Sequence, residues 1–165
     1  MPSQPQLKGI SAAPGLAQGA AFWVDASAMV HSADSLEPTI DLSEALALAS
    51  SQLVELMESI EGEEAEILEF QLAMLEDEAL SDPVRQAVAA GTTLIEAWQQ
   101  TLDEHVTDYE QSEDEYFQAR ASDLRDIRER VLRILLGETE AEIPEGAILL
   151  ATDLTPSRFL SLDWN

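Results

Sequence analysis

The chain holds few side chains with the reactivity that catalysis needs. It has no cysteine, which removes thiolate chemistry, disulfides and zinc–cysteine sites together. One of its two histidines, His31, lies in a polar segment, and the other, His105, lies on the apolar stripe of an expected helix, where a core role is typical. Neither the phosphate-binding loop GxxxxGKS/T nor the zinc-binding pattern HExxH occurs. We therefore expect no catalysis by these residues alone.

The charge balance limits the kind of partner. The 33 aspartates and glutamates face only 8 lysines and arginines, which gives a formal net charge of −25. Nucleic acids and anionic membrane surfaces attract clustered lysine and arginine, so we expect neither as a partner. A hydrophobic fraction of 45% in 165 residues allows one ordinary folded domain or two small ones. No stretch is typical of a transmembrane helix or a signal peptide, which predicts a cytoplasmic protein, or a piece of one, with a basic partner.

Residues 63–78, EEAEILEFQLAMLEDE, are the most informative stretch, because they contain acids and apolar residues but no lysine or arginine. Helical spacing places the apolar residues in two rows. The rows are Ile67, Phe70 and Met74, and Leu68, Leu72 and Leu75. One interpretation is a thick core helix with a solvated acidic rim. The other is that one row packs in the bundle while the second, ringed by carboxylates, docks a partner that is basic and apolar.

Residues 120–137, RASDLRDIRERVLRILLG, carry five of the 8 basic residues. Acids alternate with these arginines, which predicts weak ion pairs within the bundle or on its surface. Arg120 opens this helix, where the helix macrodipole disfavours a cation. Arg120 is therefore the best candidate for a role outside its own helix.

The rest of the pattern runs from strands to helices and back. Residues 7–24, LKGISAAPGLAQGAAFWV, predict a strand, a Pro-Gly turn and a second strand. Helices are then expected between about 40 and 137, and residues 147–151 and 156–162 predict a strand and a short helix. The expected helix signals are the capping pairs Asp41–Glu44 and Thr93–Glu96, Pro83 as a first helical residue, and Gly137 as a helix end. Strands on both sides of helices predict a helical bundle inserted into an α/β layer.

Four blocks of the chain, in order, resemble enzyme I, the phosphoenolpyruvate–protein phosphotransferase family of the bacterial sugar phosphotransferase system. The blocks are LKGISAAPGLAQGAA, LAMLEDEAL, RASDLRDIRERVLRILLG and ILLATDLTPS. The fold class implied is α+β or α/β, with a bundle of about four helices, one of them broken, inserted into an incomplete swivelling phosphohistidine-type domain. The resemblance assigns residues 1–38 and 139–165 to the two parts of that domain and 39–138 to the inserted HPr-binding bundle.

The resemblance implies a phosphoryl relay for the parent protein. In this family the phosphoryl group passes from phosphoenolpyruvate to a histidine and then to the carrier HPr. That histidine lies in a Gly-Gly-x-Thr-x-His segment shortly after an Asp-Leu-Thr-Pro-Ser block, which is 153–157 here. The last residue of the sequence is Asn165, and no such segment precedes it, so the resemblance places the phosphohistidine beyond Asn165.

The resemblance also bears on what the chain can do alone. A C-terminal barrel that binds phosphoenolpyruvate and magnesium in the family has no counterpart among these residues. We therefore expect no catalytic residue here, and an inactive fragment without a cofactor, truncated before the phosphohistidine motif. We also expect the fragment to be monomeric and its parent to be a homodimer that uses magnesium.

The resemblance further implies which residues contact HPr, a basic phosphocarrier with an apolar patch, and it agrees with the docking interpretation of residues 63–78. The implied contacts are Glu63, Glu66, Glu69, Phe70, Gln71, Met74, Asp77 and Glu78, with Tyr109, Phe117 and Arg120 as outer contacts. Gln71 fits the family pattern only loosely. Phe70 replaces a small residue and could shift or block the docked partner.

Two alternatives stay open from the sequence. The parent could be a nitrogen-regulatory paralogue or a multidomain phosphoryl-transfer protein such as the dihydroxyacetone kinase relay. The chain could instead be an acidic helical interaction module unrelated to phosphotransfer. That last alternative predicts that residues 1–24 and 147–151 do not form neighbouring strands.

Overall fold

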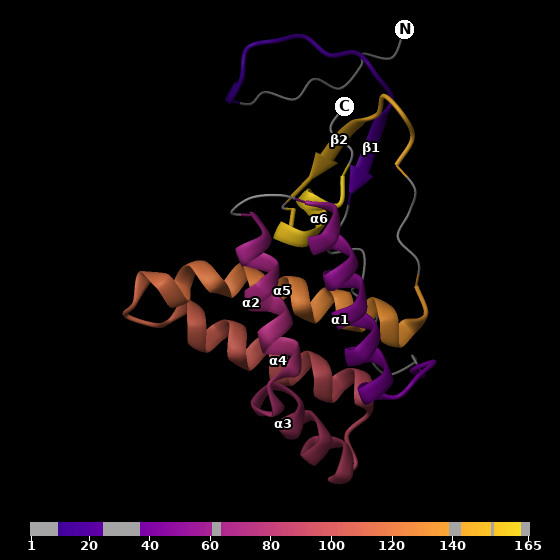
Figure 1. Cartoon of the computed structure of the whole chain (residues 1–165), viewed down its shortest axis with the longest axis vertical. Coiled ribbons are helices and arrows are strands. Elements are labelled where there is room, and N and C mark those ends of the chain that lie inside the picture. Colours follow the sequence, from indigo (N-terminus) through magenta and orange to yellow (C-terminus); the bar gives the residue numbers. More distant parts are fainter. Residues whose placement is uncertain (1–9, 25–36, 61–63, 139–142, 153, 163–165) are drawn as a thin grey trace, which may run out of the picture.

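A computed structural model describes residues 10–24, 37–60, 64–138, 143–152 and 154–162. Six helices and a two-stranded sheet make up the described part of the chain (Figure 1). In chain order they are β1 (Ala21–Val24), α1 (Leu42–Ser59), α2 (Glu64–Glu76), α3 (Glu78–Ala89), α4 (Leu94–Glu110), α5 (Glu115–Leu136), β2 (Ile148–Ala151) and α6 (Pro156–Leu160). The mostly helical character expected from the sequence is confirmed.

The predicted capping residues delimit the helices. The Asp41 carboxylate accepts a hydrogen bond from the Glu44 amide at 2.9 Å, and the Thr93 hydroxyl accepts one from the Glu96 amide at 3.3 Å. Each bond satisfies a backbone donor that the first helical turn leaves without an intrahelical partner. At the other end of the bundle, α5 stops at Gly137, whose φ of 66° lies in the left-handed region that glycine adopts easily. These three predictions are confirmed.

The structure corrects the predicted start of the third helix. The sequence places Pro83 at the first helical position, whereas α3 begins at Glu78. The reason is an earlier cap, because the Asp77 carboxylate accepts a hydrogen bond from the Ala79 amide at 2.8 Å. The helix that follows the Asp77 cap continues through Pro83, which therefore lies inside α3, where proline lacks the backbone N–H that a helix interior uses.

The structure also corrects both ends of the α/β layer. Residues 10–20, expected to include part of a first strand, are exposed and irregular, and residues 7–9 lie outside the described part. The second expected strand is present as β1. The final strand and helix are shorter than expected: β2 begins at Ile148 rather than at Ala147, and α6 ends at Leu160 rather than at residue 162.

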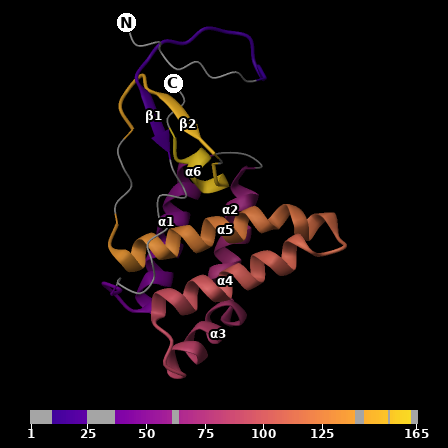
Figure 2. The same cartoon turned by 180° about the vertical axis from the view of Figure 1, so that it is seen from behind.

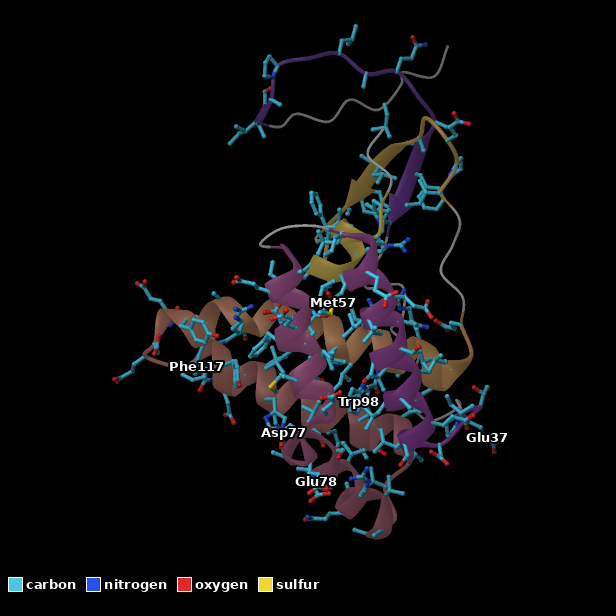
Figure 3. All side chains as sticks on the ribbon, in the orientation of Figure 1. Glu37, Met57, Asp77, Glu78, Trp98 and Phe117 are labelled. Atoms are coloured by element: carbon cyan, nitrogen blue, oxygen red, sulfur yellow. The ribbon has the colours of Figure 1, made fainter. Side chains whose placement is uncertain are left out.

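Two pairs of helices and α3 form the bundle. The hairpin of α1 and α2 crosses the antiparallel pair of α4 and α5, and α3 packs beneath α4 (Figures 1 and 2). Trp98 is fully buried in the centre (Figure 3), and its indole N–H donates to the Arg128 carbonyl oxygen at 3.0 Å, which joins α4 to α5. Apolar residues of five helices complete the core around it, including Leu53, Leu68, Leu80, Leu102, Leu124 and Leu135.

The strands lie side by side although all five bundle helices separate them in sequence. β1 pairs with β2 in parallel, with Ala21 opposite Ile148 and Val24 opposite Ala151. The Ile148 amide also donates to the Ala20 carbonyl oxygen at 2.8 Å. The alternative of an unrelated acidic helical module predicted that these segments would not pair, and that prediction is wrong. In the part of the chain that the structure describes, no helix is long and apolar enough to cross a membrane.

The close approach of Gly19 to the β2 turn gives the first prediction. A Cβ at Gly19 would clash with the Gly146 carbonyl oxygen, a backbone atom that no rotamer change can remove. Overpacking of this kind costs about 1–3 kcal/mol. We expect Gly19→Ala to speed hydrogen exchange of the Ile148 amide by roughly tenfold or more, measured by NMR. Gln18→Ala is the control, because Gln18 is exposed and adjoins Gly19 in the chain. Equal protection in the two variants would contradict the prediction.

Candidate docking site

Helix α2 has one buried side and one half-exposed side. Leu68, Gln71 and Leu75 follow one another at spacings of three and four residues and are buried against the bundle. Phe70 and Met74, on the neighbouring stripe, are half-buried, and Glu69 is exposed. The row formed by Ile67, Phe70 and Met74 is therefore not sealed inside the bundle. The buried side confirms that α2 is a core helix, and the other side leaves an apolar surface beside carboxylates.

Arg120 connects α2 to the far end of α4 and α5. Its guanidinium lies 4.7 Å from the centre of the Phe70 ring and 5.2 Å from that of Tyr116. Phe117 makes edge-to-face contacts with Tyr116 and with Tyr109, at centroid distances of 5.7 and 5.3 Å. Cation and rings thus form a continuous chain across three helices, with Phe117 at the free end of the α4–α5 hairpin (Figure 3).

We call this surface the aromatic–acidic face. It comprises Glu66, Glu69, Phe70, Met74, Tyr109, Tyr116, Phe117 and Arg120. The structure thus brings together most of the residues predicted to touch a partner. The prediction that Arg120 opens its helix is wrong, because the Asp114 cap starts α5 at Glu115. Arg120 nevertheless contacts a residue of another helix, since Phe70 belongs to α2.

Two other predicted contacts, Asp77 and Glu78, are exposed at the junction of α2 and α3. The Asp77 amide donates to the Met74 carbonyl oxygen at 3.3 Å, so Asp77 adjoins the Met74 end of the face, at a distance from Phe117 (Figure 3), and its side chain also caps α3. Glu63 lies outside the described residues. Asn165, beyond which the resemblance places the phosphohistidine, lies outside them as well, so the position of that histidine stays a prediction.

Gln71 requires a correction. The sequence places it among the partner contacts, whereas its side chain is fully buried and cannot touch a docked protein. Its amide nitrogen donates to the Asp126 carboxylate at 3.0 Å and lies 3.5 Å from an oxygen of Asp123. Two carboxylates fix the orientation of the amide, because its own oxygen would be repelled from both. Gln71 is therefore a polar residue of the core that joins α2 to α5.

Asp123 links Arg120 to this buried group. Arg120 donates to Asp123 at 3.2 Å, and the Asp123 side chain is nearly inaccessible to solvent. Burial raises the pKa of Asp123 above its ordinary value, although hydrogen bonds from Arg120 and Gln71 oppose the shift. For Arg120, burial lowers the pKa, but Asp123 and Tyr116 outweigh it and leave the pKa raised. Arg120 therefore stays charged beside the rings.

Asp126 joins the bundle to α6. One of its oxygens accepts from the Ser157 amide at 2.7 Å, and the other accepts from the Ser157 hydroxyl at the same distance. That hydroxyl in turn accepts from Arg130 at 2.7 Å, and Arg130 also donates to Gln52 of α1 at 3.0 Å. Desolvation lowers the pKa of Arg130, and the charge of Asp126 partly offsets it. Buried charges need such partners, and both Asp126 and Arg130 have them.

Other arginines of α5 form ion pairs, as the alternation of charges predicted. Arg125 pairs with Glu110, and Arg128 pairs with Asp103 at 2.8 Å, both on α4. All four side chains are partly exposed, so each pair contributes little to stability by itself. Both pairs join α4 to α5.

Sequence reasoning missed four residues of this region. They are Tyr116, Asp123, Asp126 and Ser157. A signal for Tyr116 was present, because it adjoins Phe117 in the first turn of α5. For the aspartates the signal is their spacing, since 120, 123 and 126 fall on one side of a helix that otherwise buries apolar residues. Ser157 lies in the ILLATDLTPS block, but the resemblance gave it no contact with the bundle.

The described residues offer little else for a small ligand. A cavity of about 490 Å³ lies between α1, α5 and α6, and its charged lining consists of Arg130, Arg133, Glu55 and Glu138. These charges balance, so the cavity has no net preference for an anion or a cation. In the described part of the chain, no cluster of three or more histidine, aspartate or glutamate side chains is arranged to hold a metal ion.

Comparisons with known proteins place the chain in a family. Residues 8–120 match the family model described as PEP-utilising enzyme, N-terminal. A phosphoenolpyruvate-protein phosphotransferase of Listeria monocytogenes is 32% identical over 97% of this chain and 30% of its own length. Its counterpart from Bacillus subtilis is 30% identical over 92% of this chain and 29% of its own length. The chain thus spans about 30% of the length of the relatives it matches.

A solved structure shows the same architecture. The NMR solution structure of an Enzyme I protein matches with a TM-score of 0.69 and 26% identity, over 94% of this chain and 68% of the other. The fold and the sequence thus define an amino-terminal segment of a phosphoenolpyruvate-utilising enzyme. The chain belongs to that family, and among its members it is similar to enzyme I, as the four sequence blocks predicted.

The raised pKa of Asp123 predicts how acid affects stability. Because the folded chain keeps the proton of Asp123 at a higher pH than the unfolded chain does, it binds more protons between the two pKa values. Lowering the pH through that window therefore favours folding at this site, whereas at neutral pH the buried charge is a cost. We expect the free energy of unfolding to rise relative to that of Asp123→Asn as the pH falls from about 7 towards about 4, measured with urea.

Ser122→Ala is the control for this measurement, because Ser122 adjoins Asp123 in the chain and does not titrate. Its difference from the unmodified chain should stay constant with pH. A difference between the unmodified chain and Asp123→Asn that is flat, or that shrinks on acidification, would contradict the raised pKa.

Proposed function

We propose that this chain docks a basic phosphocarrier of the HPr type on its aromatic–acidic face. The parent protein is then a phosphoenolpyruvate–protein phosphotransferase, which passes a phosphoryl group from phosphoenolpyruvate through a histidine to HPr. Family membership supports this, because the relatives carry that name. The observation that carries the docking proposal is that Phe70 and Met74 are half-exposed beside exposed carboxylates, on a helix whose opposite side is buried.

The domain arrangement follows from the same proposal. Residues 39–138 are the docking module, and residues 1–38 and 139–165 belong to two parts of a swivelling phosphohistidine-type α/β domain. The parallel pairing of β1 with β2 supports this division, since the two strands flank the helices in sequence and adjoin in space. Parallel strands need a crossover between them, and here the whole bundle is that crossover.

The chemistry of the face suits a partner with lysines or arginines around an apolar centre. Met74 is adaptable in shape, and the Phe70 ring supplies flat apolar area. Glu66 and Glu69 lie on the same helix and are exposed, so they can meet cations without a large desolvation cost. The net charge of −25 attracts a basic protein over a distance and speeds encounter at low salt.

Titration of isotope-labelled HPr from Listeria monocytogenes tests the docking proposal. We expect weak binding, micromolar or weaker, that weakens further with salt because exposed charges are screened. Glu69→Lys should weaken it by roughly tenfold, since it places a cation against a basic partner. Glu58→Lys, an exposed substitution of the same kind on α1, should leave the affinity unchanged apart from the shared loss of net charge.

A second pair of variants tests the apolar centre of the face. Met74→Asp should abolish binding, whereas Leu48→Asp, at an exposed apolar residue of α1, should not. Thermal unfolding by circular dichroism identifies any variant that has lost its fold. Absence of shifts in HPr at low salt, with the unmodified chain folded, would refute docking.

Phosphoryl transfer gives a separate prediction. The chain contains two histidines, His31 and His105, and neither lies in a Gly-Gly-x-Thr-x-His segment. Incubation with labelled phosphoenolpyruvate and magnesium should therefore leave no label on the 165-residue chain. The relative from Bacillus subtilis, incubated in parallel, is the positive control. Label on either histidine, located by mass spectrometry, would overturn this part of the proposal.

A further inference from the structure

A single buried carboxylate receives hydrogen bonds from two different helices. The same oxygen of Asp126 accepts from the Gln71 amide of α2 at 3.0 Å and from the Ser157 backbone amide of α6 at 2.7 Å. The Ser157 hydroxyl holds the second oxygen, also at 2.7 Å. We call Gln71, Asp126 and Ser157 the buried bridge. It joins α2 to α6 through one residue of α5.

Burial makes each of these bonds hard to replace. Gln71 is 0% exposed, and Asp126 and Ser157 are each 1% exposed, so water cannot substitute for a lost partner. Loss of one donor therefore leaves a charge short of hydrogen bonds, which is more costly than loss of an exposed bond. At the start of α6, moreover, the Thr155 side chain makes no capping bond. Asp126 supplies the cap from another helix.

The buried bridge also reaches the aromatic–acidic face. The Gln71 amide nitrogen lies 3.5 Å from Asp123, whose other oxygen accepts from Arg120 at 3.2 Å. Arg120 lies over the ring of Phe70, and Phe70 precedes Gln71 in the chain. A partner that displaces Arg120 removes a donor from Asp123, which adjoins the Gln71 amide. A partner that displaces Phe70 moves the residue that precedes Gln71 in the chain. Either displacement therefore acts on the Gln71 amide. α6, at the other end of the bridge, follows β2 in the chain and contacts α1 and α5.

We propose that Gln71 and Asp126 are positioning residues that couple occupation of the aromatic–acidic face to the seating of α6 on the bundle. The inference rests on the proposed docking function, which supplies the partner. The buried bridge itself rests only on the hydrogen bonds described above. Residues of one hydrogen-bonded network have non-additive energies, so a change at one end is felt at the other. Coupling between two sites is reciprocal: a seated α6 favours docking, and a docked carrier favours a seated α6.

The first experiment needs no partner. The Ser157 amide proton donates to a carboxylate, so its NMR chemical shift reports on the state of Asp126. Gln71→Leu, on α2, removes a hydrogen-bond donor from Asp126 of α5. It should therefore move the amide resonance of Ser157, which lies on α6 and donates to the same carboxylate. Glu76→Gln, an exposed change on α2, should leave that resonance in place. An unmoved Ser157 resonance in a folded Gln71→Leu variant would overturn the bridge.

The second experiment measures the coupling to docking. Ser157→Ala should weaken binding of HPr by roughly fivefold, although Ser157 is buried and α6 contributes no residue to the face. Ser161→Ala is the matched control, because the exposed Ser161 hydroxyl donates only within α6, to the Arg158 carbonyl oxygen. In the reverse direction, HPr should shift the Ser157 amide resonance of the unmodified chain.

The outcomes separate this inference from the proposed function. If HPr binds the unmodified chain and the Ser157→Ala variant equally well, the docking function stands and the coupling is wrong. If HPr binds neither, both the docking function and the coupling are wrong, while the Gln71→Leu result still decides whether the bridge joins α2 to α6. Weaker binding of Ser157→Ala with Ser161→Ala unchanged supports the coupling.

Discussion

The burial of Asp126 is the constraint on which the arrangement of this protein depends. A carboxylate in the interior is stable only if donors surround it, and those donors must come from whichever elements pack there. Gln71 of α2 and the Ser157 amide of α6 donate to Asp126, and Arg130 of α5 donates to the Ser157 hydroxyl. α6 follows β2 in the chain, and β2 pairs with β1, so the same group fixes the chain to the bundle shortly after it leaves the sheet.

The residues that α2 buries in the core determine which of its residues remain on the surface. With Leu68, Gln71 and Leu75 committed to the core, helical geometry leaves Phe70 and Met74 on the neighbouring stripe. Arg120 then covers part of the Phe70 ring and is held there by Asp123. A strongly acidic chain thus presents one ordered cation within an apolar and acidic surface. That combination is specific in shape and charge, which a uniformly acidic surface is not.

The sequence predicts what depends on local patterns. Apolar periodicity and capping residues such as Asp41, Thr93 and Gly137 locate the helices, because each acts within a few residues of the chain. The predicted start at Pro83 is wrong because a second local signal, the Asp77 cap, competes with it. The irregular residues 10–20 show that a small, apolar composition alone does not define a strand.

The docking site is harder to predict, because it depends on contacts between distant residues. Gln71 looks like a surface residue in sequence, since its partners Asp123 and Asp126 lie 52 and 55 positions away. The stacking of Arg120 on Phe70 likewise follows from the packing of α2 against α5, which periodicity does not specify. The family resemblance identified the helix, but it could not separate the residues that face a partner from the one that faces the core.

The most direct test of the central claim is the contact between Met74 and the carrier in the complex. With methionine methyl groups of the chain labelled and HPr unlabelled, NMR cross-relaxation reports which methyl group lies against the partner. The account predicts intermolecular signals from Met74 on α2 and none from Met57, the half-buried methionine of α1 (Figure 3). Signals from Met57 without Met74, or no signals from a saturated complex, would contradict it.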